Sequence, residues 1–299
     1  MMLVIVVLLC GILSVSFSYL ISIAIWGKSV FFDAGNPETL NLDFLRFTQM
    51  INQVGIFLIP PVIFAWLSFK SPASFLGFRK PDGKHLIAAI VLIVVGGPFT
   101  GFLVSLNEGL QLPEQLSGIT DWMRSSEDVA AKLTNRFLEA PGTVSLVINI
   151  IMIGLLPAIG EELLFRSSLI GIFKRMFKGI HMPVIISAFI FSALHLQFFG
   201  FLPRFMLGLV FGYLFVWTGS IWIPVTAHFI NNTSVVIASY LYNQGLISID
   251  VNEMGNSDSA LWIGLSTLSV FLILIWVYST RRKTSEICQH PQSNIFNGF

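Results

Sequence analysis

The stretch from Gly142 to Phe173, GTVSLVINIIMIGLLPAIGEELLFRSSLIGIF, decides how we expect this chain to fold. Residues 142–160 carry no charge, and their number is close to the about 20 apolar residues that a helix needs to cross a bilayer. Two glutamates and an arginine follow within 161–166, and apolar residues then resume. If one helix continues to the end of this stretch, it carries all three charged side chains into the membrane.

The rest of the chain is also strongly apolar. Of its 299 residues 55% are hydrophobic and only 11% are charged, and the mean hydropathy is +0.80, whereas a soluble domain carries about 25% charged residues. Further apolar stretches long enough to cross a membrane lie at 3–26, 47–69, 86–106, 182–203, 205–249 and 260–280. The stretch 205–249 is long enough for two helices and breaks at Thr218-Gly219-Ser220. The sequence therefore predicts an all-α polytopic membrane protein, a bundle of about eight transmembrane helices with a polar site inside the membrane.

The placement of charges predicts how these helices are oriented. We expect one transmembrane domain over 1–280 and a polar cytosolic tail over 281–299, with the first helix retained rather than cleaved as a signal peptide. With eight spans both termini lie on one side, and that side holds eleven of the 17 Lys and Arg residues. Lys and Arg are enriched in cytoplasmic loops, so a multi-pass protein of the cell membrane with both termini in the cytosol is expected. The loop 107–141 is expected to form a helix on the membrane surface.

The composition also argues against some partners and bonds. The net charge of +1 shows no basic footprint of the kind that binds nucleic acid. Cys10 and Cys288 lie in the first apolar span and in the tail, so a disulfide framework is not expected. Membrane lipids are the expected surroundings, and the oligomeric state is left open.

Ionisable residues inside the predicted spans are the main functional signal. A charged group at the bilayer centre costs about 2.5–3.5 kcal/mol on insertion scales and usually marks a functional site. Glu162 and Arg166 are four residues apart, so they share a helix face and can pair. Glu161 points about 100° away from Glu162 on an ideal helix and is free to face another group. The alternative is that all three residues lie at the cytosolic end of a helix, among the lipid headgroups.

Two further polar places lie in later spans. His195 is expected in the middle of the apolar span 182–203, and His228 and Asn232 are one helical turn apart on one face. Polar groups in a membrane helix need partners in the protein interior. Each of the two places can therefore be read either as a functional group or as a hydrogen-bonded packing contact between helices.

The three places can meet if the helix that begins at Gly142 continues to Phe173. A carboxylate, two imidazoles and an amide in one dry pocket can activate a water molecule and stabilise an oxyanion. Glu161, His195 and His228 could instead hold Zn²⁺ or another divalent metal, because His and carboxylate are common zinc ligands.

At these residues the sequence resembles the CPBP family of intramembrane proteases, also called the Abi or type II CAAX prenyl endopeptidase family. The family pattern is two adjacent glutamates followed by x-x-x-Arg, then Phe-x-x-x-His, then His-x-x-x-Asn. Here it reads Glu161-Glu162-x-x-x-Arg166, Phe191-x-x-x-His195 and His228-x-x-x-Asn232. The resemblance covers about 142–244 and includes Gly208-x-x-x-Gly212, which we interpret as a helix-packing motif.

The resemblance implies a role for each residue. Glu161 would be the base that activates the attacking water, with His195 beside it. His228 and Asn232 would stabilise the oxyanion, and Glu162 and Arg166 would be a supporting pair. The substrate class that the resemblance implies is a membrane-associated protein or peptide, prenylated or otherwise lipidated. It leaves open whether a metal takes part.

Two other functions are compatible with parts of the pattern. Glu and His in membrane helices also relay protons in transporters, but the internal repeats typical of transporters are not visible in the sequence. A non-catalytic membrane protein of the bacteriocin-immunity type is the other alternative, because a fold can persist without its chemistry. The complete polar set favours an intramembrane endopeptidase over both.

Overall fold

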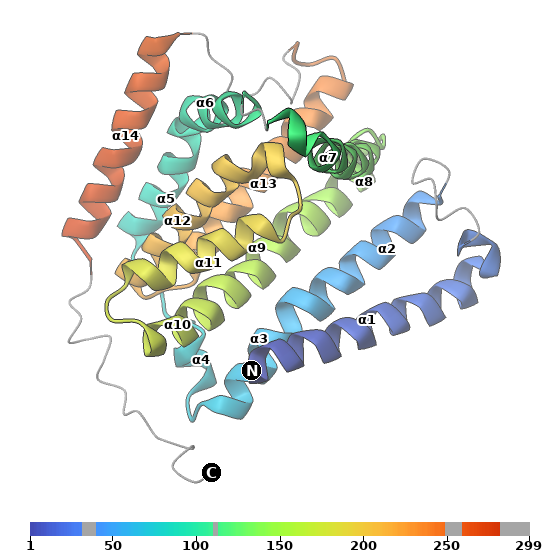
Figure 1. The fold of residues 1–299 in the computed structure, drawn as a ribbon, viewed down its shortest axis with the longest axis horizontal. Helices are drawn as coiled ribbons and strands as arrows, with labels where there is room; N and C mark the ends of the chain where they lie inside the picture. Colours follow the sequence, from blue (N-terminus) through green and yellow to red (C-terminus); the bar gives the residue numbers. More distant parts are fainter. Residues whose placement is uncertain (32–39, 110–112, 249–258, 282–299) are drawn as a thin grey trace.

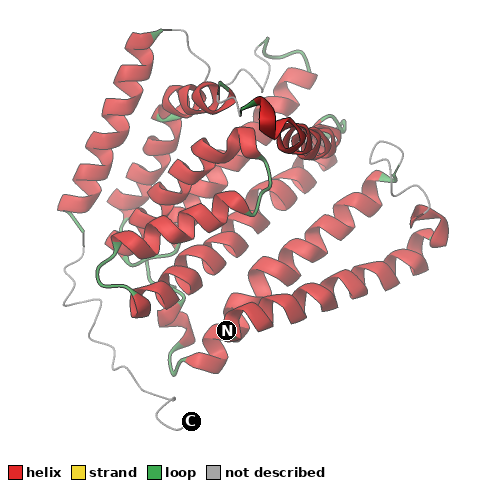
Figure 2. Cartoon of the chain, viewed as in Figure 1, coloured by secondary structure: helices red, strands yellow, loops and turns green. Residues whose placement is uncertain are grey.

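The computed structural model describes residues 1–31, 40–109, 113–248 and 259–281, and this part of the chain is helical without any strand (Figures 1 and 2). The expected all-α fold is therefore confirmed. Before the candidate site come α1 (Met2–Trp26), α2 (Leu42–Gln53), η2 (Val54–Leu58), α3 (Ile59–Ser68), α4 (Pro72–Phe75), α5 (Gly83–Val95), α6 (Gly97–Glu108) and α7 (Ser117–Leu138). The long central helix consists of α8 (Thr143–Asn149), η4 (Ile150–Leu155), α9 (Leu156–Glu161), η5 (Glu162–Leu169) and α10 (Ile170–Met176). Then follow α11 (His181–Ala193), η6 (Phe198–Gly200), α12 (Phe201–Thr218), α13 (Trp222–Asn243) and α14 (Ala260–Ser279).

The number of candidate membrane spans is lower than the eight crossings predicted. Five helical segments are long and apolar enough to cross a bilayer, or six if α5 and α6, which bend by 49°, form one span. The protein is thus a multi-pass membrane protein, but eight crossings are not confirmed. One reason is length, because the 13 residues of α11 rise by about 20 Å, less than the about 30 Å of hydrocarbon core. The other is composition, since α13 carries His228 and two asparagines through its middle.

The prediction that one helix continues through the charged cluster is confirmed. Residues 143–176 form a single 34-residue helical span, with π-helical turns at η4 and η5. Pro157 explains the first of these turns, because a proline lacks an N–H and its ring clashes with the carbonyl four residues earlier. The wider π turn accommodates that clash without breaking the helix. Glu161, Glu162 and Arg166 therefore lie within the span and not at its end.

The predicted break in the stretch 205–249 is also found. Helix α12 ends at Thr218 and is followed by Gly219, whose φ of 68° is left-handed, a conformation that glycine adopts without steric cost. The backbone N–H of Ile221 then donates to the carbonyl of Gly77, at 2.9 Å. This contact ties the start of α13 to the turn that follows α4.

The Phe-x-x-x-His motif lies elsewhere than predicted. His195 was expected in the middle of a span over 182–203, but α11 ends at Ala193 and His195 lies in the following turn. The N–H groups of His195 and Leu196 bond to carbonyls three residues back, and Leu196 has a positive φ of 54°. A left-handed residue of this kind ends an α-helix, and the chain reverses into α12.

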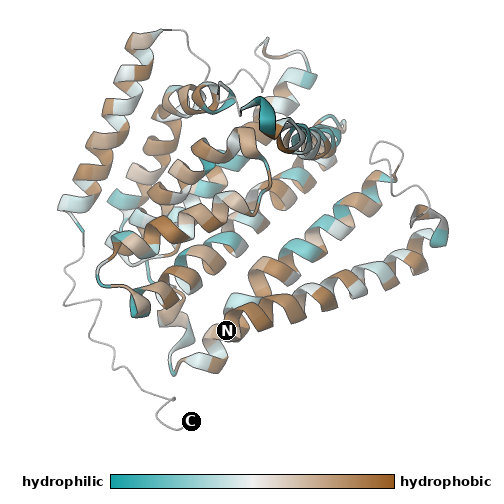
Figure 3. Ribbon diagram, viewed as in Figure 1, coloured by the Kyte–Doolittle hydropathy of each residue, from teal (hydrophilic) through white to brown (hydrophobic). Residues whose placement is uncertain are grey.

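The outermost helices present apolar side chains outward. Helices α1 and α14 lie at opposite edges of the bundle and are largely apolar along their lengths (Figures 1 and 3). Large side chains such as Leu8, Leu13 and Leu272 are more than half exposed. Many large apolar side chains exposed along one helix are costly in water and are typical of contact with lipid.

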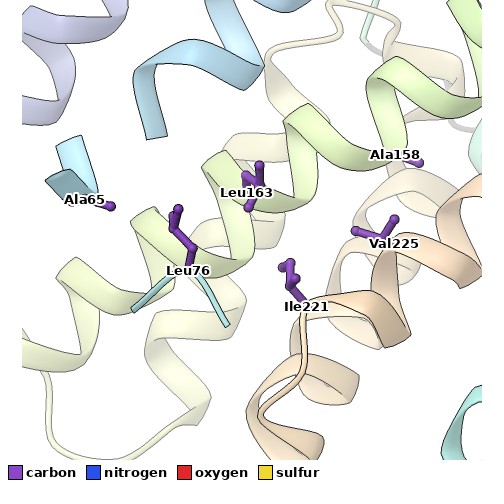
Figure 4. Close-up of a cluster of buried hydrophobic side chains, with 6 residues drawn as sticks. All are labelled: Ala65, Leu76, Ala158, Leu163, Ile221 and Val225. Carbon is purple, nitrogen blue, oxygen red and sulfur yellow. The ribbon is translucent and has the colours of Figure 1, made fainter. Parts of the chain in front are cut away.

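A buried apolar cluster fixes the central helix against its neighbours. Ala158 and Leu163 on the central helix pack with Ile221 and Val225 at the start of α13, together with Ala65 and Leu76 (Figure 4). The glutamates at 161 and 162 lie between the first two of these residues, and His228 follows Val225 by one turn. The cluster therefore sets the register in which the acidic residues meet α13.

Other predictions concern segments away from the polar motifs. The predicted surface helix is present as α7, although its placement on a membrane is not tested. Cys10 is a free thiol, whereas Cys288 and residues 282–299 of the predicted tail lie outside the described residues. The cytosolic placement of the termini and the extent of the single domain stay predictions.

Candidate active site

A chain of three buried side chains forms the centre of the site. Arg166 Nε donates to Glu162 Oε2 at 2.9 Å, which confirms the predicted pair. The other carboxylate oxygen of Glu162 accepts from Nδ1 of His228 at 3.0 Å. A carboxylate accepts hydrogen bonds and does not donate them, so Nδ1 of His228 carries a proton in this contact. The second ring nitrogen, Nε2, is thereby directed away from Glu162.

Glu161 lies on the other side of the same imidazole. Its Oε2 is 3.9 Å from His228 Nε2, and its Oε1 accepts a hydrogen bond from Gln53 Nε2 at 3.1 Å. The residue is 8% exposed and Glu162 is fully buried. The two glutamates therefore flank one histidine, with Glu162 in direct contact and Glu161 separated by a gap in which a shared water can bond to both groups.

Gly160 makes the contact between Gln53 and Glu161 possible. A Cβ at this position would lie 3.0 Å from Cβ and 3.2 Å from the carbonyl carbon of Phe57 in η2. Backbone atoms cannot move away as the tip of a flexible side chain can, so any larger residue would push η2 from the central helix. The glycine that precedes the two glutamates thus lets α2 and η2 approach closely enough for Gln53 to reach the site.

Aromatic rings enclose the Arg166 and His228 side chains. The guanidinium carbon of Arg166 lies 4.7 Å from the ring centre of Phe191, a cation–π distance. Phe211 stacks on the imidazole of His228 with ring centres 5.3 Å apart. Two further N–H-bearing nitrogens of Arg166 have no hydrogen-bond partner within the described part of the chain. The rings therefore take the place of water around the cation, and they keep the ion pair dry.

Asn232 bonds to the backbone at the proline-induced turn. Its Nδ2 donates to the carbonyl of Ile153 at 3.0 Å, and this is the carbonyl four residues before Pro157 that a regular helix would have used. Its Oδ1 accepts from Asn231 Nδ2 at 3.1 Å. An amide nitrogen has two N–H donors, so one remains available beside the site.

His195 is near these groups without touching them. Its Nδ1 bonds to the carbonyl of Phe191 at 2.8 Å, and its side chain is exposed. The charges of Glu161, Arg204 and His228 lie close enough to act on its ring. The structure thus brings Glu161, Glu162, Arg166 and His228 together and places His195 in the turn after α11, outside their hydrogen bonds.

Several polar side chains hold the loop that carries His195. Asn107 of α6 is buried; its Nδ2 donates to the carbonyl of Phe198 at 2.8 Å and its Oδ1 accepts from the N–H of Leu202 at 2.9 Å. Glu127 of α7 accepts from the N–H of Phe199 at 3.0 Å. Irregular backbone at membrane depth needs such partners, so α6 and α7 fix where this loop lies.

Two of these residues were not identified from the sequence. Gln53 and Asn107 lie in or next to the apolar stretches 47–69 and 86–106, and a polar amide in an apolar stretch is the signal that would have found them. Neither lies within a motif, and neither is near the glutamates in sequence. Only the packing of α2 and α6 shows what they contact.

The metal site that the sequence left possible is not assembled within the described residues. Within the ranges that the structure describes, no three His, Cys, Asp or Glu side chains are grouped closely enough to hold a metal ion. His228 already uses Nδ1 on Glu162, and His195 does not contact Glu161. The residues Glu161, His195 and His228 in this arrangement do not fit Zn²⁺ or another divalent metal.

Comparison with protein families then gives one finding. Residues 143–234 match the family model described as type II CAAX prenyl endopeptidase Rce1-like. This match confirms the resemblance drawn from the sequence motifs. The Rce1-like region begins at α8 and ends within α13, so it contains the three motifs and excludes Gln53 and Asn107. No curated protein and no solved structure matches the chain.

Proposed function

We propose that this protein is an intramembrane endopeptidase that hydrolyses a peptide bond of a membrane-associated or lipidated protein or peptide. One observation carries the proposal: Glu161 faces His228 Nε2 across 3.9 Å while Glu162 holds the opposite ring nitrogen at 3.0 Å. A base, an oriented imidazole and a supporting carboxylate are the parts that water activation needs. The Rce1-like match of residues 143–234 supports a protease of the CAAX type.

In the proposed reaction, Glu161 acts as the general base. It takes a proton from a water molecule held between its carboxylate and His228 Nε2, and the water oxygen forms a bond to the substrate carbonyl carbon. The tetrahedral intermediate then collapses as the C–N bond breaks, and protonated Glu161 returns the proton to the leaving amine. One water is consumed, and the products are a carboxylic acid and an amine.

The remaining side chains act on the intermediate. The proposed donors to the oxyanion are the second N–H of Asn232 Nδ2 and the Nε2–H of His228, whose ring is proposed to carry a proton on both nitrogens throughout the reaction. His195, in the turn after α11, is proposed to orient the incoming water or substrate. Glu162 and Arg166 are positioning residues, because Glu162 holds the His228 ring and Arg166 holds Glu162. No step of this mechanism passes through a metal.

The test is a search for uncut substrate in membranes. Quantitative mass spectrometry compares cells that carry the wild type, Glu161→Gln, and Glu114→Gln as a control outside the predicted spans. We expect membrane-associated peptides to accumulate intact only with Glu161→Gln, and expression levels should match in all three. Near-native processing by Glu161→Gln would contradict the proposal. Transport of an ion by proteoliposomes with no cleavage would favour the transporter alternative.

A further inference from the structure

Gln53 contacts the proposed base from outside the Rce1-like region. It is the last residue of α2 and is buried, and its Nε2 donates to Glu161 Oε1 at 3.1 Å. An ionised carboxylate only accepts hydrogen bonds, so the amino group of this side chain, and not its carbonyl oxygen, faces Glu161. The other oxygen of Glu161, Oε2, lies 3.9 Å from His228 Nε2. The two carboxylate oxygens therefore have different neighbours.

Two glycine contacts fix the backbone that follows Gln53. Gly55 in η2 packs so closely on α1 that a Cβ there would lie 2.2 Å from the Cβ of Ser14. Gly160 allows a similar approach between η2 and the central helix, where its Cβ would lie 3.0 Å from the Cβ of Phe57. Both contacts involve the π-helical turn that starts directly after Gln53. The amide is therefore held in place before any reaction, as a group that orients a catalytic side chain needs to be.

We propose that Gln53 is a positioning residue that selects Oε2 of Glu161 as the basic atom, an inference that rests on the proposed function. A glutamate carboxylate rotates easily about its last C–C bond. The hydrogen bond to Oε1 opposes this rotation and keeps Oε2 directed to the water that His228 Nε2 also contacts. After the proton transfer Oε2 carries the proton, and Oε1, now a carbonyl oxygen, still accepts from Gln53. The bond thus persists and keeps the proton on the oxygen that returns it to the leaving amine.

A packing role is the other interpretation of this contact. Polar groups in membrane helices need partners in any case, so a bond between two helices does not by itself imply a role in the reaction. The acceptor favours positioning, because Gln53 donates to the side chain of the proposed base, whereas Asn107 and Asn232 donate to backbone carbonyls. The two interpretations predict different results, since the loss of a packing bond lowers stability without acting selectively on His228 Nε2.

One measurement is independent of cleavage. Full-length protein in detergent micelles is labelled with ¹⁵N in its histidine rings, and the ring signals of His228 are identified by their loss in His228→Gln. Gln53→Met keeps the length of the side chain and removes the donor. We expect the Nε2 signal of His228 to shift, because Glu161 Oε2 no longer keeps its place beside it. The Nδ1 signal should stay, because the 3.0 Å bond to Glu162 is unchanged.

The second measurement is kinetic and uses a membrane peptide that the wild type cleaves. Gln53→Met should lower kcat by about tenfold to hundredfold, the cost of a misplaced catalytic group. KM should stay the same, since Gln53 is not proposed to touch the substrate. Gln53→Asn keeps the donor on a side chain one methylene shorter, so its kcat should lie between the two. Asn52→Leu is the matched control: the Oδ1 of this neighbouring amide has no hydrogen-bond partner in the described part of the chain, and its removal should change neither kcat nor the His228 signals.

Three results would overturn the proposal. They are a wild-type kcat in both Gln53 variants, a higher KM with kcat unchanged, which would assign Gln53 to substrate binding, and Nδ1 and Nε2 signals of His228 that shift together or not at all. If Gln53→Met does not yield folded protein, Gln53→Asn decides by the same criteria. If the wild type cuts no peptide but only the Nε2 signal responds to Gln53→Met, the proposed hydrolysis fails while the orientation of Glu161 by Gln53 stands.

Discussion

His228 is bonded through Nδ1 to Glu162, and this contact leaves its Nε2 facing Glu161. The two glutamates are adjacent in sequence, yet one binds the ring directly and the other faces it across a gap. Since Glu162 also holds Arg166 at 2.9 Å, a single carboxylate fixes both the cation and the imidazole. The chemistry proposed for Glu161 depends on this fixed ring.

Replacing Glu162 by Gln should damage both stability and activity. It leaves Arg166 buried without its counter-ion, and breaking a buried pair in this way costs about 3–5 kcal/mol. We expect a lower unfolding temperature in detergent and strongly reduced cleavage. The double variant Glu162→Gln/Arg166→Met should recover stability but not activity. Recovery of both would show that the carboxylate acts only as a counter-ion.

The bond between Asn232 and the Ile153 carbonyl can be separated from catalysis. Asn232→Ala removes that partner, which should lower stability by about 1–3 kcal/mol. In a Pro157→Ala background the N–H of residue 157 becomes available to the same carbonyl, so the stability cost should fall. Cleavage should stay low in both backgrounds if the Asn232 amide also contacts the oxyanion. Restored cleavage in the double variant would limit Asn232 to a structural role.

Gly160 should not tolerate a larger residue. Gly160→Val places side-chain atoms against the Phe57 backbone, so η2 must move and the bond from Gln53 to Glu161 should weaken. We expect cleavage to fall while the helical content stays the same by circular dichroism. Gly264→Val in α14 is the matched control, since a Cβ there meets nothing within 4 Å. Equal activity of the two variants would contradict this account of Gly160.

Asn107 should position His195 through the loop backbone. Asn107→Ala leaves the Phe198 carbonyl and the Leu202 N–H without their partner. We expect KM or kcat to change by about tenfold and the loop amides to exchange hydrogen faster. Asn243→Ala removes an exposed amide-to-carbonyl bond to Leu138 and is the control. Loop exchange that stays as slow in Asn107→Ala as in the wild type would show that Asn107 is not a positioning residue.

The motifs of the sequence identified most of the site. The spacing of Glu162 and Arg166 predicted their pairing, and the apolar residues after the charged cluster predicted a continuous helix. Both are local properties of one helix, which is why spacing sufficed. The predicted placement of His195 in the middle of a span was wrong, because apolar character alone does not show where a chain reverses, and the left-handed Leu196 has no strong signal.

Contacts between distant segments could not be predicted in the same way. The bond from His228 to Glu162 depends on the register of α13 against the central helix. The cluster that contains Ala158 and Val225 sets this register. Gln53 reaches Glu161 from 108 residues away. Eight crossings are not confirmed, because the short α11 and the polar α13 each count as one apolar stretch when hydropathy is the only guide, whereas neither is long and apolar enough as a helix.

The most direct measurement follows oxygen from water into product. Purified protein in nanodiscs is incubated with a membrane peptide in H₂¹⁸O, and the new carboxyl terminus is analysed by mass spectrometry for the wild type and for Glu161→Gln. The account predicts one ¹⁸O atom in the wild-type product and no product with Glu161→Gln above the background of empty nanodiscs. Cleavage by Glu161→Gln at the wild-type rate would contradict the assignment of Glu161 as the base that activates water.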